Sequence, residues 1–273
     1  EYWRENAGGL GLGYNDPAGS TPILAALGNH DLYGNQNKNI YSLDAPSSSD
    51  KKFAIAKYNT YFEFEPNTAD NSQLYHRQDY GPVTILFLDT VTDNPNNFRK
   101  GSAQYDWIVE NLMDAQTNAM FTIVVSHQTP YSGGKHGNES DVKNVRNTLG
   151  PLMIQYGVDA WLCGHCEAQE HSQVPGTEVL PDGTERPHVV NVYDLGSGGD
   201  GLLCAKHEDN PYSVFNSLDD SSDGIHYGHL LIDVKPSADK GIWQLTMTPM
   251  YSYIGSVRIA RTMPPGPVVS PTD

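Results

Sequence analysis

Apolar residues along this chain gather in short continuous runs separated by polar, glycine-rich or proline-rich segments. Three of these runs are followed at once by residues with metal-binding or proton-transfer side chains. Residues 23–27 precede Gly28-Asn29-His30-Asp31, residues 121–125 precede Ser126-His127, and residues 158–162 precede Cys163-Gly164-His165. Runs of this length predict buried strands, and α/β proteins gather their ligands at the carboxyl ends of such strands. The pattern therefore predicts three strands that deliver histidines to one place.

Other parts of the pattern predict helices between further strands. Residues 83–89 form a continuous apolar run bounded by Gly81-Pro82 and by a turn rich in Asn and Pro, which predicts a buried strand. Ser102 is placed to cap a helix whose apolar residues recur at helical spacing. A second helix is expected from Ser140, with an interruption at Gly150-Pro151, where the proline suits a fresh first turn.

The last third of the chain is dominated by strands. Residues 189–193 predict a strand, residues 196–201 a tight glycine-rich loop, and residues 227–234 with 242–250 an antiparallel hairpin. Strands that alternate with helices and then follow one another predict a layered α/β architecture, with sheets packed between helices. We expect one domain over residues 1–262, followed by a proline-rich extended tail over 263–273.

The formal net charge of −16 excludes some classes of partner. An acidic field of this size repels nucleic acid and anionic lipid, so neither is an expected partner. No apolar run approaches the roughly 20 residues of a membrane span, so no membrane insertion is expected. The N-x-[ST] sequon at Asn138 and the abundance of Asn, Ser and Gly favour a secreted glycoprotein, extracytoplasmic or in a vacuole or lysosome. The pattern indicates no oligomeric state.

Three cysteines leave the disulfide pattern open. Cys163 and Cys166 flank Gly164-His165, and Cys204 lies in a glycine-rich region further on. One bridge that involves Cys204 would leave one thiol buried on its strand. The C-x-x-C spacing alone is also the pattern of a zinc or redox site, but no second pair accompanies it.

Asn29, His127 and His165 supply one amide oxygen and two imidazole nitrogens after three predicted strands. This donor set suits a borderline divalent ion such as zinc, manganese or iron(II). His30 is next to Asn29 and is followed by Asp31, so a carboxylate is available to orient a histidine that does not bind the metal. A histidine held protonated in this way donates its proton to a leaving-group oxygen.

The same residues carry a specific resemblance. Gly28-Asn29-His30-Asp31, Ser126-His127 and Gly164-His165 match, in order and spacing, three of the five motif blocks of the calcineurin-like metallophosphoesterases. The chain most resembles the small purple acid phosphatases of the tartrate-resistant type. That similarity also takes in Phe87-Leu88-Asp89-Thr90 and Pro130-Tyr131-Ser132-Gly133-Gly134, and it covers most of residues 22–200.

The resemblance implies a four-layer αββα sandwich and hydrolysis of phosphate monoesters by a metal-bound hydroxide. Two metals, bridged by an oxygen ligand, would act together in such a site. Carried over residue by residue, Asn29, His127 and His165 would hold the second, divalent metal. His30 would stabilise the transition state or protonate the departing alkoxide. His136 lies on the loop where the family lines its substrate mouth, so a substrate-side role is expected for it.

Two features depart from the family pattern. The first two blocks, D-x-H or D-x-G and G-D-x-x-Y, would lie upstream of Gly28, and no residue before it matches them. The chain is therefore expected to begin in the helix between the second and third blocks, without the N-terminal strands and helix. The final block of the family is G-H-x-H, whereas this chain has Glu167 at the last position. Glu167 either binds iron or manganese in altered form or marks a first, iron-type metal site that has been lost.

Three functional hypotheses remain from the sequence. The leading one is an acid-phosphatase-like, metal-dependent phosphomonoester hydrolase, active when the full-length chain is present. The alternative is a catalytically degenerate protein that kept the phosphatase fold for a binding or structural role. A single-metal or redox protein that uses Cys163 and Cys166 ranks last.

Overall fold

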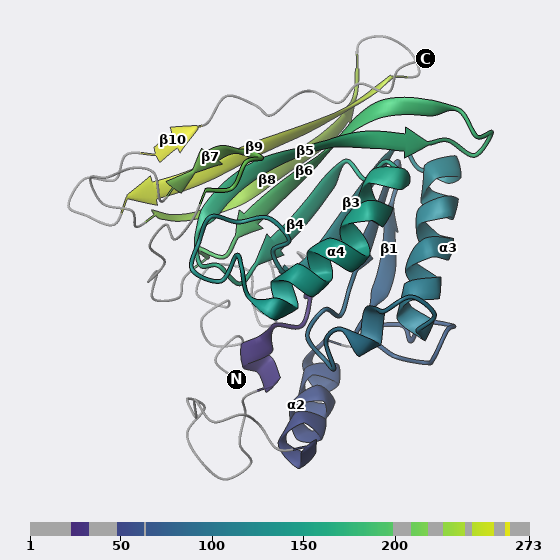
Figure 1. The fold of residues 1–273 in the computed structure, drawn as a ribbon, viewed down its shortest axis with the longest axis vertical. Coiled ribbons are helices and arrows are strands. Elements are labelled where there is room, and N and C mark those ends of the chain that lie inside the picture. The colour runs from purple at the N-terminus through teal and green to yellow at the C-terminus, as the bar shows by residue number, and fades with distance from the viewer. Residues whose placement is uncertain are drawn as a thin grey trace, which may run out of the picture.

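A mixed sheet of seven strands forms the centre of the fold (Figure 1). The computed structural model describes residues 23–32, 48–62, 64–198, 209–217, 226–237, 242–253 and 260–262. The strand order in the large sheet is β1-β2-β3-β4-β6-β5-β7. In chain order these strands are β1 (His76–Tyr80), β2 (Val83–Phe87), β3 (Phe121–Gln128), β4 (Ala160–Gly164), β5 (Gln169–Val179), β6 (Glu185–Leu195) and β7 (Ser213–Asn216).

The middle of this sheet is parallel. β2 pairs with β3, β3 with β4, and β4 with β6 in the parallel sense, whereas β1, β5 and β7 pair antiparallel with their neighbours. Parallel strands covered on both faces read as continuous apolar runs, which is why β2, β3 and β4 could be predicted from the sequence. The carboxyl ends of all four parallel strands meet at one edge of the sheet, so the loops that follow them lie together.

Two helices cover one face of the sheet. They are α3 (Ala103–Asn118) and α4 (Ser140–Gln155), with a short 3-10 turn, η2 (Asn96–Phe98), before α3. α3 begins as predicted, because the Ser102 hydroxyl accepts a hydrogen bond from the Tyr105 amide at 3.2 Å. The fully buried core between helices and sheet includes Leu86, Ile108, Leu112, Val145, Leu149 and Trp161.

The predicted interruption of α4 at Gly150-Pro151 is wrong. α4 continues through Pro151 to Gln155. Proline removes one backbone hydrogen bond from a helix interior. Burial of Leu149, Leu152 and Met153 against the sheet, on both sides of the proline, offsets that loss and keeps the last turn helical.

A second sheet packs on the other face of the large one. It has the order β10-β9-β8 and consists of β8 (His226–Pro236), β9 (Trp243–Tyr253) and β10 (Ala260–Thr262). β8 and β9 form the predicted antiparallel hairpin. Leu245 and Met247 of β9 are buried against Phe121 and Ile123 of β3, which makes a core between the sheets. The protein therefore has the layered α/β fold expected from the sequence. In the described residues, a layer of helices, the seven-stranded sheet and the three-stranded sheet follow one another.

The segment before the first histidine motif differs from expectation. Residues 23–28 form no strand, and Asn29–Leu32 form a 3-10 turn, η1. The backbone of the segment is partnered by a side chain, because the Tyr58 hydroxyl of α2 (Ser48–Tyr61) donates to the Ala25 carbonyl at 2.7 Å. Leu27 is fully buried in the small core with α2. The apolar run at residues 23–27 therefore reflects packing against a helix, and within the described ranges no strand pairs with this segment.

Several expectations concern residues outside the described ranges. They are the helix expected at the start of the chain, the end of the glycine-rich loop at 199–201, Cys204 with its disulfide, and the extended tail at 263–273. Among the described helices, none combines the length and apolar character that a bilayer crossing requires.

Asp159, just before β4, links the stability of the sheet to pH. Its buried carboxylate accepts a hydrogen bond from the Thr122 amide at 2.8 Å. Burial, with a contribution from nearby Glu178, raises the pKa of Asp159 to about 7. In the unfolded chain this group ionises near pH 4, so the folded state holds a proton that the unfolded state has released between about pH 4 and 7. The contribution of Asp159 to the free energy of unfolding is therefore lost as the pH rises from about 4 to 7.

Asp159→Asn removes this titration and keeps an oxygen that can accept from Thr122. The quantity to compare is the free energy of unfolding of the wild type minus that of Asp159→Asn. We expect this difference to fall by up to roughly 4 kcal/mol between pH 4 and pH 8. Urea unfolding at several pH values measures this difference, and other titrating groups cancel in it. Two stability curves that run parallel with pH would contradict the role given to Asp159.

Candidate metal and active site

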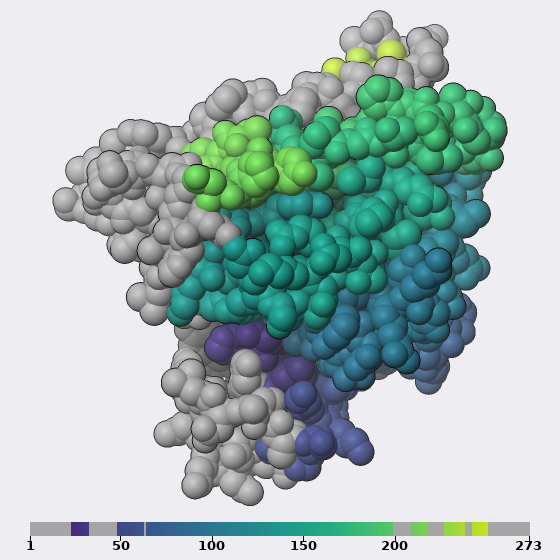
Figure 2. Space-filling view, in the orientation of Figure 1, coloured from purple at the N-terminus to yellow at the C-terminus, as the bar shows by residue number. Residues whose placement is uncertain are grey.

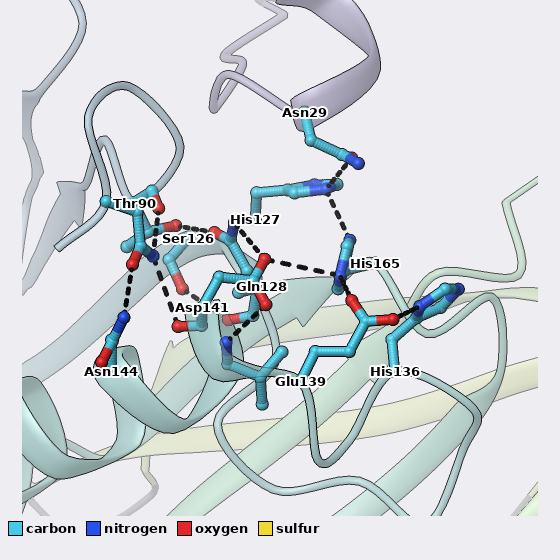
Figure 3. Close-up of polar contacts among 12 residues, drawn as sticks. Asn29, Thr90, Ser126, His127, Gln128, His136, Glu139, Asp141, Asn144 and His165 are labelled. Carbon is cyan, nitrogen blue, oxygen red and sulfur yellow. Dashed lines mark hydrogen bonds and ion pairs between the residues drawn. The ribbon is translucent and has the colours of Figure 1, made fainter. Parts of the chain in front are cut away.

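Asn29, His127 and His165 lie together at the carboxyl edge of the sheet. The Asn29 side-chain oxygen is 2.7 Å from His127 Nε2, and His127 Nε2 is 3.1 Å from His165 Nδ1 (Figure 3). Asn29 and His127 are 98 residues apart in the sequence. Figure 2 shows residues 23–32, in purple, next to the teal part of the surface. The three donor atoms predicted from the sequence are thus brought to one point, and their role as metal ligands stays a prediction.

Adjacent parallel strands account for the two histidines. β3 and β4 are paired, and after an irregularity in their register Gln128 lies opposite Gly164. His127 and His165 therefore leave neighbouring strand ends. The Trp161 indole of β4 donates to the Ser126 hydroxyl at 2.8 Å, which ties the two strands together one residue before His127.

A tight turn directs His165 back toward His127. His165 and Glu167 have φ values of 74° and 51°, a conformation that is uncommon for residues other than glycine. Gly196, which directly follows β6, lies close against this turn, since a Cβ on Gly196 would lie only 2.5 Å from the Glu167 amide nitrogen. Glycine at position 196 allows the two backbones to approach, and a side chain there would displace the turn that carries His165.

The electrostatics of the site favour neutral imidazoles. Burial, with repulsion from His165 and His30, lowers the pKa of His127 to about 3. Burial also lowers the pKa of His165, against attraction from Asp141 and Glu139. A neutral ring keeps a lone pair for a metal, and one amide oxygen with two such nitrogens is a donor set that divalent zinc, manganese or iron accepts. The residues present therefore fit the ion that the family implies.

His30 and Asp31 occupy η1 at the exposed rim of the site. One Asp31 carboxylate oxygen accepts a hydrogen bond from the Gly28 amide at 2.8 Å, so Asp31 closes the turn that presents Asn29 and His30. His30 is an electrostatic neighbour of both Asp31 and His127. The catalytic roles of His30 and Asp31 stay predictions from the sequence.

Glu167 lies on the same turn as His165, yet it does not join the cluster of ligand atoms. Among the described residues, the acidic and imidazole groups that converge closely enough to hold an ion are His136, Glu139 and His165. The positive φ of Glu167 follows from the turn and from its contact with Gly196. Its predicted role as a ligand to a first metal stays a prediction.

Sequence reasoning missed two carboxylates beside His165. The carboxylate oxygens of Glu139 and Asp141 lie 3.7 Å and 3.9 Å from His165 Nε2, and His136 Nδ1 is 2.7 Å from Glu139 (Figure 3). Glu139 is the N-cap residue of α4, and Asp141 lies in the first turn of that helix. The available signal was the spacing His136-x-x-Glu139 just before a predicted helix start. The sequence analysis assigns a substrate-side role to His136 and a sequon to Asn138, and it gives no role to Glu139.

The cysteine pair does not form a disulfide. Cys163 carries a buried free thiol on β4, 3.7 Å from the Ser126 hydroxyl. Burial raises the pKa of the Cys163 thiol, so the thiol stays protonated and is a poor metal ligand or nucleophile. Within the described part of the chain, nothing favours a redox or zinc site built on the C-x-x-C spacing.

Several known proteins are similar to this chain. The chain matches the family model of the calcineurin-like phosphoesterases over residues 8–166. It is 29% identical over 153 residues to tartrate-resistant acid phosphatase type 5 of Oryctolagus cuniculus. The aligned stretch covers 54% of this chain and 43% of that relative. It is 25% identical over 198 residues to probable purple acid phosphatase 20 of Arabidopsis thaliana. Here the aligned stretch covers 71% of this chain and 42% of that relative.

Among solved structures, purple acid phosphatase PPD1 from seeds of yellow lupin (Lupinus luteus) has a similar fold. The TM-score is 0.53 at 18% identity, over 85% of this chain and 39% of that chain. The chain thus spans less than half the length of the relatives it matches. The family match and these relatives support, at the level of the family, a metal-dependent phosphatase. With its three motif blocks in place and more than half of its residues matched, this chain belongs to the calcineurin-like phosphoesterase family.

Proposed function

We propose that the protein hydrolyses phosphate monoesters with a divalent ion held by Asn29, His127 and His165. The observation that carries this proposal is the meeting of one amide oxygen and two imidazole nitrogens from three distant segments. A bound ion would supply Lewis-acid charge to the phosphoryl oxygens and lower the pKa of the attacking water. Zinc, manganese and iron(II) are the candidates, because mixed nitrogen and oxygen donors suit them.

The chain's own residues perform the remaining steps. His30, exposed at the rim beside Asn29, donates a proton to the departing alkoxide, since a poor leaving group needs one at ordinary pH. Asp31 holds the turn through the Gly28 amide and so keeps His30 in position. His136 is close to His165, with its ring 4.9 Å away, and is placed to contact substrate oxygens. We expect the natural setting to be extracytoplasmic, in line with the sequon at Asn138.

For the first, iron-type metal we propose a site whose ligand set is altered. Glu167 stands where the family has a second histidine, and a carboxylate there would bind iron or manganese less tightly than the complete ligand set. The alternative function, a catalytically degenerate protein with a binding or structural role, rests on this same residue.

The test uses the full-length protein with added zinc, manganese or iron(II). We expect hydrolysis of a chromogenic phosphate monoester at acidic pH, and we expect His30→Ala to lower kcat by about a hundredfold or more while metal content is unchanged. His229→Ala, an exposed histidine on β8, is the matched control and should leave kcat unaltered. Absence of turnover under all metals supports the degenerate alternative, and an unchanged rate in His30→Ala removes its assigned role.

A further inference from the structure

We propose that the Nε2 side of His165 carries a second divalent-cation site, formed with Glu139, Asp141 and His136. This site differs from the Asn29 and His127 site, and it goes beyond the proposed function because it needs neither of those residues. The two ring nitrogens of His165 face different groups, and a neutral imidazole offers a lone pair on only one of them. With an ion at each site, His165 would release its remaining ring proton to solvent and bridge the two ions as an imidazolate. Nδ1 faces His127 at 3.1 Å, whereas Nε2 faces the two carboxylates at the start of α4.

The Nε2 atom lacks the partner that burial normally demands. The His165 side chain is only 7% exposed, and its Nε2 has no hydrogen-bond partner. Buried polar atoms without a partner are uncommon and expensive. A cation between this nitrogen and the two carboxylates would provide the missing partner.

The spacing of the donors matches a metal better than direct hydrogen bonds. His165 Nε2 is 3.7 Å from Glu139 Oε2 and 3.9 Å from Asp141 Oδ2, too long for a hydrogen bond. Two ligands each about 2.1 Å from a tetrahedral ion lie about 3.4 Å apart. A movement of a few tenths of an ångström would therefore seat a small ion between them.

His136 completes the donor set. One ligand atom each from His136, Glu139 and His165 lies within 4.8 Å of the others. His136 Nδ1 is 2.7 Å from Glu139 Oε1, which leaves the other oxygen of that carboxylate directed at His165 (Figure 3). Two imidazoles and two carboxylates favour zinc, manganese or iron(II) over calcium, which prefers oxygen ligands alone. Glu139 is 48% exposed and Asp141 31%, so an ion can enter from solvent.

The test counts zinc ions on full-length protein that has first been stripped with a chelator. Calorimetric titration with Zn²⁺, followed by elemental analysis after gel filtration, gives the affinity and stoichiometry. We expect the double variant Glu139→Gln/Asp141→Asn to bind one zinc fewer per chain than the wild type. Asp106→Asn/Glu110→Gln makes the same change of charge on the exposed face of α3 and should leave the count unchanged.

Further variants separate this site from the one in the proposed function. Asn29→Ala/His127→Ala should leave zinc at the Glu139 site, and His136→Ala should weaken that zinc at least about tenfold. Full wild-type stoichiometry and affinity in Glu139→Gln/Asp141→Asn would overturn the proposal, as would loss of all zinc in Asn29→Ala/His127→Ala. If the Asn29 variant instead binds as much zinc as the wild type while the Glu139 variant loses an ion, the proposed function fails and this site stands. Circular dichroism spectra identical to the wild type show that each variant is folded.

Discussion

His127→Ala is expected to lower kcat/KM for a phosphate monoester by at least about a hundredfold in the full-length protein. His127 stands between the Asn29 oxygen and His165, so its removal takes the central donor from the proposed site. Loss of residues that merely orient metal ligands already costs roughly 10- to 100-fold in affinity or activity, and loss of a ligand should cost at least as much. Elemental analysis should show a matching loss of bound metal.

His229→Ala serves as the matched control, because it removes an exposed imidazole from β8 on the second sheet. Its activity and metal content should equal those of the wild type. Wild-type metal content in His127→Ala, measured on folded protein, would show that this imidazole is not a ligand.

Trp161→Ala is expected to reduce the free energy of unfolding by about 3 to 5 kcal/mol. Trp161 is only 1% exposed, lies in the core between helices and sheet, and donates its indole N–H to Ser126 at 2.8 Å. The truncation leaves a large cavity beneath α4 and removes the tie between β3 and β4. Urea unfolding followed by circular dichroism measures the loss.

Trp161→Phe separates the two contributions. Phenylalanine keeps most of the apolar volume but cannot donate to Ser126, so we expect a loss of about 1 to 3 kcal/mol. Equal losses in the alanine and phenylalanine variants would show that the hydrogen bond, rather than packing, dominates at this position.

The parallel strands at the centre of the large sheet could be predicted because their sequence is simple. β2, β3 and β4 are buried on both faces in a parallel sheet, and such strands are continuous apolar runs whatever their neighbours are. Residues 23–27 show the limit of this reasoning. An apolar run also arises where a segment packs against a helix, as Leu27 does against α2, and the sequence does not distinguish the two cases.

The carboxylates beside His165 could not be predicted for a different reason. Glu139 and Asp141 lie at the start of a helix, where acidic residues are common simply because they stabilise the positive end of the helix dipole. Only the packing of α4 on the sheet directs them toward His165 Nε2. The uninterrupted course of α4 through Pro151 likewise follows from burial against the sheet rather than from local preference.

The amino-acid sequence by itself determined the class of fold and which side chains are proposed as metal donors, because strand periodicity and the chemistry of amide and imidazole groups are local properties. The tertiary structure alone decided which donors share a point in space. The turn at His165, the close approach of Gly196 and the position of α4 set where each nitrogen and oxygen points. Those directions depend on contacts between segments far apart in the chain, and a local pattern of residues contains no record of them.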